Sequence, residues 1–104
     1  YLEDVRDEFF MITSFDIKQE KKDKIPAVVH VDGTVRPQMV QKETNQRYWE
    51  LIKEFGDITG EYIVLNTSFN VMGEPIINHP KEAIRCFFDS GIDYLFLGNY
   101  MLSK

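Results

Sequence analysis

Apolar residues in the middle of the chain recur at the spacing of an amphipathic helix. Four of them fall at positions i, i+3, i+4 and i+7, which places them on one helix face: Tyr48, Leu51, Ile52 and Phe55. Thr44 or Asn45 can cap the start of this helix, and Gly56 can end it.

A second helix is predicted to begin at Pro80, because proline suits the first helical position. It should stop at Gly91. We expect its apolar face to be buried: Ala83, Ile84, Phe87 and Phe88.

Three segments of the first half have the residue types of strands. Residues 9–15 are rich in strand formers, and residues 27–31 form an apolar run after Pro26. Asp32-Gly33 is typical of a two-residue hairpin, so residues 34–40 would return beside 27–31. Pro37 places that return strand at an edge or a bulge.

The second half alternates short apolar runs with the second helix. Residues 62–66 and 93–97 are predicted buried strands, with a further short strand at 100–102. A strand, a helix over 80–89 and a second strand form one unit, whose strands should lie parallel through a right-handed crossover. The predicted class is α/β or α+β with a mixed sheet, antiparallel in its first half.

Composition indicates a chain with a hydrophobic core, without a membrane span or an internal disulfide. The chain has 104 residues, of which 43% are apolar and 13% aromatic, which is enough for the core of one domain. No apolar run approaches the roughly 20 residues of a membrane span. One cysteine cannot form an internal disulfide. The acidic, non-Met start at Tyr1 resembles no secretory signal, and we expect a piece of a longer cytoplasmic protein.

The net charge of −5 argues against general nucleic-acid binding, which rests on clustered Lys and Arg. The basic run at residues 18–24 is interrupted by two acidic residues and is interpreted as a solvated loop. The two histidines and single cysteine lack metal-site spacing. His79 precedes Pro80 at a helix start, where a capping or structural role is expected in preference to catalysis, and Cys86 is expected to be a buried, inert thiol.

Residues 66–75 form the first candidate site. The segment leaves the carboxyl end of a predicted strand, where ligands of open α/β sheets bind. Its polar groups suit phosphate or amide oxygens: Asn66, Thr67, Ser68 and Asn70. Gly73 allows close backbone approach. The alternative is that these side chains only stitch the loop to itself, and composition favours neither interpretation.

Residues 30–38 form the second candidate. Arg36 can hold a phosphate or carboxylate, and His30 can act as a base, a donor or a ligand. The alternative is a surface hairpin whose polar side chains face water. In a regular hairpin, His30 and Arg36 would lie on opposite faces, so only one of them would touch a given ligand.

Three segments resemble signatures of one family. Residues 25–38 resemble a signature of the O-carbamoyltransferases of the nodulation-protein NodU and antibiotic-carbamoylation type, and residues 65–76 look like the second. Residues 91–100 are similar to the family's ending. Residues 67–75 are also similar to the Thr-Ser-Ala-Asn-x-Ser-Gly-x-Pro loop of the YrdC threonylcarbamoyl-adenylate synthases, which lines a nucleotide pocket.

The resemblance implies part of a carboxyl-terminal YrdC-like domain, here incomplete. Such a domain forms carbamoyl adenylate from carbamoyl phosphate and ATP, with Mg²⁺. An amino-terminal domain of the actin-like ATPase superfamily then transfers the carbamoyl group to a hydroxyl of a sugar, nodulation factor or antibiotic.

The resemblance also implies roles for single residues. Arg36 would be the catalytic cation on a phosphate or carbamoyl oxygen, with His30 and Thr34 as secondary contacts. The second loop would orient the phosphate and carbamate groups through Asn66, Thr67, Ser68, Asn70 and Gly73.

Two departures from the family change the expectation. The basic segments that precede this region in relatives are absent, so we expect the isolated chain to be inactive and to bind nucleotide weakly. Met72 stands where many relatives have a basic or polar residue. An exposed sheet edge would allow homo-oligomers. The alternative functions are a non-catalytic nucleotide-binding or docking module and, disfavoured by the acidic charge, an RNA-binding domain.

Overall fold

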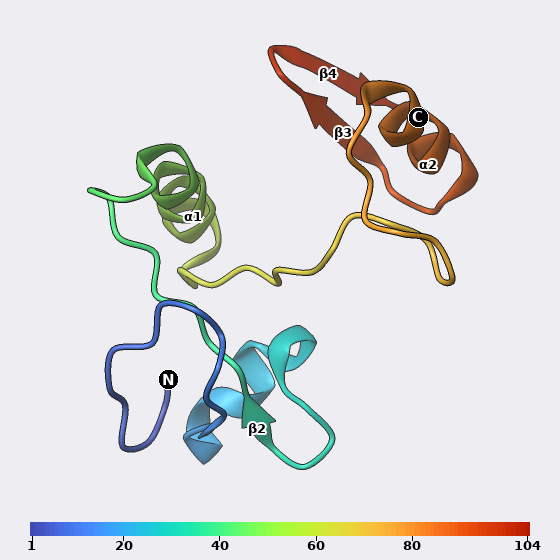
Figure 1. Cartoon of the computed structure of the whole chain (residues 1–104). Coiled ribbons are helices and arrows are strands. Elements are labelled where there is room, and N and C mark those ends of the chain that lie inside the picture. The colour runs from blue at the N-terminus through green and yellow to red at the C-terminus, as the bar shows by residue number, and fades with distance from the viewer. The chain divides into compact units, whose positions relative to one another are not determined.

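The computed structural model describes all 104 residues and divides into two compact units, residues 1–65 and 66–104. Each unit combines one α-helix with a small antiparallel sheet (Figure 1). The predicted mixed α/β class is confirmed, and two small sheets with few strands are consistent with an incomplete domain. No helix is both long enough and apolar enough to cross a membrane.

The first unit has its core around a two-residue strand pair. β1 (Phe15–Asp16) pairs antiparallel with β2 (Thr34–Val35), and Phe15 faces Val35 in the register. Two short 3₁₀ helices connect them, η1 (Gln19–Lys24) and η2 (Pro26–Val28). The buried residues of this core are Ile17, Ile25 and Val35, against which Tyr1, Leu2, Val28, Val29 and Ile63 pack.

The predicted hairpin between residues 27–31 and 34–40 is wrong. Pro26 has no N–H and a fixed φ, which suits the first position of a helix, so the chain enters η2 instead of a strand. The turn itself is present: the Gly33 N–H donates to His30 O at 2.9 Å, and Gly33 has φ +84°. It leads into β2, whose partner is β1. Of the predicted strand over 9–15, only Phe15 belongs to a strand.

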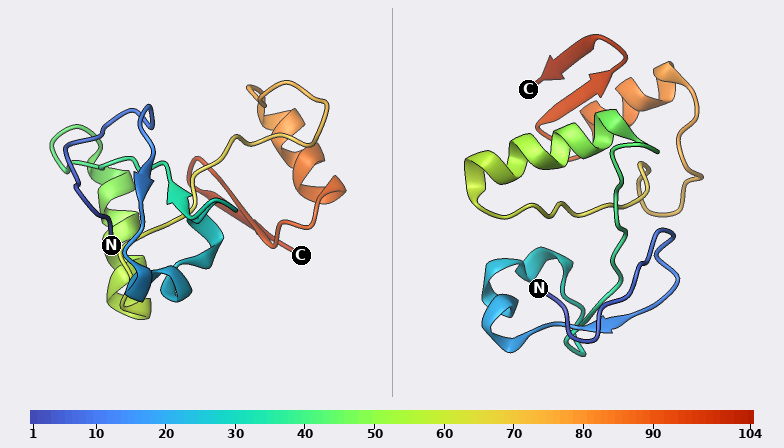
Figure 2. Two further views of the ribbon diagram at one scale, coloured as in Figure 1. Left: turned by 90° about the horizontal axis from the view of Figure 1, so that it is seen from below. Right: turned by 90° about the vertical axis from the view of Figure 1, so that its left-hand side faces the viewer.

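α1 (Gln46–Thr59) confirms the first predicted helix and its Asn45 cap, whose side chain accepts from the Tyr48 N–H at 3.3 Å. The predicted end at Gly56 is wrong, because the helix runs unbroken through it to Gly60, which has φ +85° (Figures 1 and 2). Gly56 serves packing: a Cβ there would lie 2.1 Å from Tyr62 Cδ1.

The second unit packs one helix against a hairpin. α2 (Pro80–Asp89) begins as predicted, with His79 as the residue before it but without a side-chain capping bond. β3 (Tyr94–Leu97) and β4 (Tyr100–Ser103) pair antiparallel. Gly98 has φ +61° at the first central position of their two-residue turn, as type II′ requires.

The predicted parallel strand-helix-strand unit is wrong. Residues 62–66 form no strand, and β3 pairs with β4 instead. The local pairing has a physical advantage, because a two-residue turn costs far less closure entropy than a crossover through a helix.

The core of the second unit is small. Ala83, Phe87 and Leu95 are its buried residues, and they are joined by Phe69, Ile77, Leu97 and Leu102. The expectation that Ile84 and Phe88 are buried is wrong: they are 38% and 62% exposed. A two-stranded hairpin covers only one narrow stripe of the helix, so the rest of its apolar face meets solvent.

Phe87 and Phe88 offer a matched test of this core. Phe87 is fully buried, so Phe87→Ala should lower the free energy of unfolding by about 3–5 kcal/mol. Phe88→Ala removes an exposed ring and one edge-to-face contact, which is worth about 0.5–1.5 kcal/mol. Denaturant unfolding of the full-length protein that contains this chain measures both changes. Equal losses would contradict the assignment of the core.

Gly56 allows a test in which helix propensity and packing have opposite signs. Alanine gains about 1 kcal/mol over glycine inside a helix. Because the Tyr62 ring occupies the place of the new methyl group, Gly56→Ala should instead destabilise the protein by about 1–3 kcal/mol. In a Tyr62→Ala background the same substitution should become stabilising. The four thermal melts of this cycle decide it, and destabilisation in both backgrounds would exclude the ring contact as the cause.

Candidate functional site

The loop at residues 66–77 is closed by two backbone hydrogen bonds, one at its base and one at its tip. The Ile77 N–H donates to Phe69 O at 3.0 Å, and both side chains pack into the core of the second unit. At the tip, the Glu74 N–H donates to Val71 O at 3.1 Å, and Gly73 has φ +86° at the third turn position. Only the φ requires glycine there, since a Cβ would meet no atom within 4 Å. The chain doubles back at this loop in Figure 1.

The Asn70 side chain builds this turn. Its Nδ2 donates to Glu74 O at 3.0 Å and to Val71 O at 3.3 Å. An amide nitrogen has two hydrogens, and both point to loop carbonyls. For Asn70, the structure thus shows the alternative in which the side chain bonds to its own loop. Any direct contact with a ligand would come from its side-chain carbonyl oxygen.

The acidic residue of the loop is neutralised by the following helix. Arg85 Nη2 on α2 donates to both carboxylate oxygens of Glu74, at 3.1 and 3.2 Å. The pair joins the loop tip to the helix. It also removes an uncompensated negative charge from a loop that we expect to meet anions.

The remaining polar residues of the loop face solvent. Asn66, Thr67 and Ser68 are all exposed, and Met72 at the tip is fully exposed. These neutral polar groups therefore lie at the surface of a loop that is anchored by Phe69 and Ile77 in the core of the second unit. This arrangement can bind an oxyanion by hydrogen bonds, without a net positive charge.

In the first unit, three side chains of the other candidate segment form a chain of hydrogen bonds. His30 Nδ1 lies 3.0 Å from Thr34 Oγ1, and Thr34 donates from Oγ1 to Asp32 Oδ1 at 2.8 Å. The same Asp32 oxygen accepts the Thr34 N–H at 3.0 Å. The Thr34 donors, the backbone N–H foremost, lower the pKa of Asp32 below its ordinary value.

Arg36 follows β2 directly, and its side chain is exposed while that of Val35 is buried. The sequence argument that His30 and Arg36 occupy opposite faces assumed His30 in a strand. That premise is wrong, because His30 lies in the turn before β2. His30 and Arg36 belong to the first unit, and the loop at 66–77 belongs to the second.

A buried carboxylate holds together a loop that is bonded to the segment after Arg36, and no pattern in the sequence pointed to it. Glu8 is only 8% exposed and accepts the N–H groups of Phe10 at 2.9 Å and Thr13 at 3.2 Å. These bonds, the one from Phe10 foremost, lower the pKa of Glu8. The Glu8 carbonyl accepts the Met39 N–H at 2.7 Å, which ties this loop to the candidate segment.

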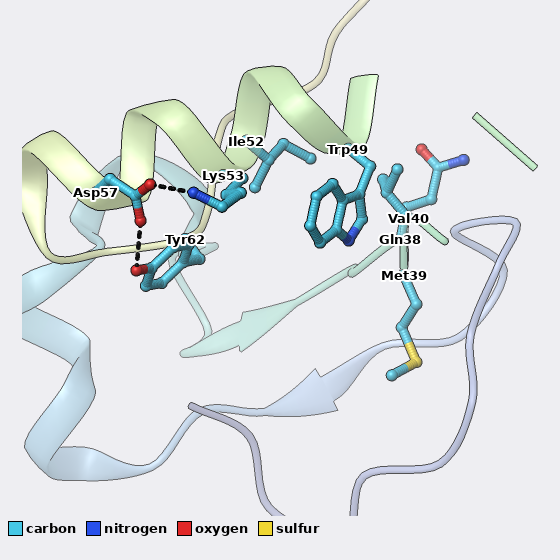
Figure 3. Close-up of a pocket in the computed structure, with 8 residues that line it drawn as sticks. All are labelled: Gln38, Met39, Val40, Trp49, Ile52, Lys53, Asp57 and Tyr62. Carbon is cyan, nitrogen blue, oxygen red and sulfur yellow. Dashed lines mark hydrogen bonds and ion pairs between the residues drawn. The ribbon is translucent and has the colours of Figure 1, made fainter. Parts of the chain in front are cut away.

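Sequence analysis also missed a pocket of about 440 Å³ beside α1 (Figure 3). Trp49 and Ile52 supply apolar walls. Asp57 accepts from Lys53 and from the Tyr62 hydroxyl, the latter at 2.9 Å. These bonds, with Lys53 first, lower the pKa of Asp57. The apolar spacing of α1 placed Ile52 on one helix face with Tyr48, Leu51 and Phe55, and Trp49 carried no signal of a pocket.

No three His, Cys, Asp or Glu side chains converge on a point that could hold a metal ion. A magnesium ion at a nucleotide site keeps several waters and is held largely by phosphate oxygens, so it needs few protein ligands. In the first unit, the exposed Arg36 guanidinium has the charge to attract a phosphate; in the second unit, the exposed polar side chains of residues 66–68 are of types that hydrogen-bond to oxyanions.

Comparison with known proteins places both segments in one family. The family model described as carbamoyltransferase C-terminus matches residues 1–104. The chain belongs to this carbamoyltransferase family. The match covers residues 25–38, 65–76 and 91–100, the three segments on which the sequence resemblance rested, and that resemblance is confirmed.

Individual relatives agree. Uncharacterized protein MJ1058 of Methanocaldococcus jannaschii is 44% identical over 94 residues, which cover 90% of this chain and 15% of that protein. Nodulation protein NolNO of Sinorhizobium fredii is 42% identical over 104 residues, covering 99% and 15%. Nodulation protein U of Rhizobium tropici is 33% identical over 95 residues, covering 91% and 16%. The chain thus spans a small fraction of the length of these carbamoyltransferase-family relatives.

Glu8 allows a pH-dependent test of the loop at residues 8–13, which is bonded to the segment after Arg36. Its pKa is lower in the folded than in the unfolded state, so its stabilisation is present above the unfolded pKa of about 4.3 and is lost as pH falls through the folded value. Glu8→Gln should therefore lower the melting temperature at pH 7. The difference from wild type should shrink below about pH 4.

The measurement is a series of thermal melts of the full-length protein from pH 7 to pH 3.5. Glu43→Gln, an exposed residue before α1, is the matched control. A difference that stays constant with pH would assign the loss to packing alone.

Proposed function

We propose that this chain is the carboxyl-terminal part of an ATP-dependent O-carbamoyltransferase, where it helps to form carbamoyl adenylate from carbamoyl phosphate and ATP. The observation that carries the proposal is the family match over the whole chain, which includes both polar segments. A cytoplasmic enzyme fits these substrates. The names of NolNO and nodulation protein U support transfer to a nodulation factor or a similar hydroxyl-bearing acceptor.

The roles of the residues follow from their exposure and charge. Arg36 is exposed directly after β2 and offers a permanent cation with a planar guanidinium to a phosphate or carbamoyl oxygen. Asn66, Thr67 and Ser68 offer neutral hydrogen bonds to the phosphate and carbamate groups. Asn70 and Gly73 hold the shape of the loop that presents them.

Catalysis of nucleotidyl transfer needs little covalent participation by the protein. Positioned donors and cations that stabilise the charge developing at the α-phosphate are sufficient, and Mg²⁺, when bound, would supply further positive charge. The isolated chain carries a net charge of −5 and is proposed to be inactive. The amino-terminal actin-like domain of the full-length protein would transfer the carbamoyl group to its acceptor, and self-association through a sheet edge would make a homo-oligomer.

The test is carbamoyl-phosphate-dependent ATP–pyrophosphate exchange by the full-length protein. Arg36→Ala removes the proposed cation, and Asn70→Ala releases the loop, so each should lower the exchange rate by about a hundredfold or more. Arg47→Ala on α1 and Asn78→Ala before α2 replace exposed residues of the same types and should leave the rate within about twofold of wild type.

Each other outcome has a definite meaning. Exchange that survives in both site variants would favour a non-catalytic nucleotide-binding or docking module. Absence of exchange in wild type would exclude carbamoyl adenylate formation as the activity of this protein.

A further inference from the structure

The hydrogen-bond chain of His30, Thr34 and Asp32 fixes where the hydrogen atoms lie. A carboxylate can only accept, so the 2.8 Å contact with Asp32 uses the single hydroxyl hydrogen of Thr34. Thr34 Oγ1 therefore has only lone pairs to offer His30 Nδ1, 3.0 Å away. Nδ1 must carry a hydrogen and donate it.

This hydrogen placement selects one tautomer of His30. When the ring is neutral and Nδ1 carries its hydrogen, Nε2 has a free lone pair and can accept a proton. The same logic operates where a carboxylate orients a catalytic histidine. His30 is exposed, so a substrate can reach Nε2.

The proposed reaction has a step that needs a proton acceptor. The oxygen of carbamoyl phosphate that must attack the α-phosphate of ATP is already bonded to phosphorus. Water must first add to the carbonyl carbon, and the bond from that carbon to the phosphate oxygen must break. The electron pair leaves with the phosphate, so that carbamate, inorganic phosphate and one proton are formed from carbamoyl phosphate and water.

We propose that His30 Nε2 takes this proton from the attacking water, and that Thr34 and Asp32 are positioning residues that hold His30 in the required tautomer. The inference rests on the proposed function. It adds Asp32 to the residues of the site, which sequence analysis had considered only as part of a turn.

The experiment separates the water step from adenylate formation. Full-length His30→Ala is supplied either with carbamoyl phosphate or with ammonium carbamate, which bypasses the water step. Phosphate release from carbamoyl phosphate should fall about a hundredfold or more, a typical loss for a general base. Exchange supported by carbamate should fall far less than phosphate release, and a melting temperature equal to that of wild type shows that the variant is folded.

Added imidazole tests whether the loss is that of a base. Because His30 is exposed, imidazole can enter the space left by His30→Ala, and phosphate release should rise with its free-base concentration. A merely structural role would give no such rescue.

Variants of Thr34 test the positioning chain. Thr34→Val removes the hydroxyl bonds to His30 and Asp32 but hardly changes the shape of the side chain. Phosphate release should fall about tenfold at saturating carbamoyl phosphate. Thr34→Ser keeps the hydroxyl and should retain most of the rate. Thr44→Val, whose hydroxyl donates only to Gln41 O at 3.2 Å, is the matched control and should match wild type.

The failures are distinguishable. A wild-type protein without exchange from either substrate refutes the proposed function, and the His30 inference with it. A wild type that is active beside a His30→Ala variant with normal phosphate release refutes the His30 inference alone. Equal losses with carbamoyl phosphate and with carbamate, or no rescue by imidazole, would make His30 a binding residue and overturn its role as a base.

Discussion

Backbone N–H and C=O groups outside helices and strands must still find partners, and in this chain polar side chains supply many of them. Glu8 accepts from two N–H groups of its loop, and Asp32 accepts from the N–H of Thr34. Asn45 does the same at the start of α1, and Asn70 donates to two carbonyls of its turn. The strands are so short that these contacts, more than sheet pairing, determine the course of the chain.

This constraint divides the polar residues of the candidate segments into two groups. Asn70 and Asp32 are used inside their loops, where they fix geometry. His30 and Arg36 remain exposed, although His30 Nδ1 also bonds to Thr34 Oγ1 within its own loop. A polar residue in a functional motif therefore need not touch a ligand. One whose hydrogen bonds define the loop acts on the ligand through the groups that the loop presents.

The sequence predicted the elements whose signals are local, and failed where a distant contact decided the outcome. Both α-helices followed from apolar spacing, with Asn45 as a cap and Pro80 as a first residue. The end of α1 was wrong because Gly56 accommodates the Tyr62 ring, which no pattern marks. The hairpin of β3 and β4 could have been found from Gly98-Asn99, a two-residue turn signal that was passed over in favour of a parallel crossover. Burial of Glu8 has no signature in sequence.

Charge is the remaining constraint on the anion site that we propose. With a net charge of −5, the chain repels a polyanionic substrate unless its acidic groups near the site are compensated. Arg85 does this for Glu74, and the Thr34 hydroxyl and N–H do it in part for Asp32 by hydrogen bonding. Arg36 is in none of the ion pairs of the structure, and the proposed function assigns its charge to an incoming phosphate. If the proposed function holds, loss of Arg85 would weaken anion binding by leaving the Glu74 carboxylate unpaired, whereas loss of Arg36 would remove the attraction directly, so the two losses have different physical origins.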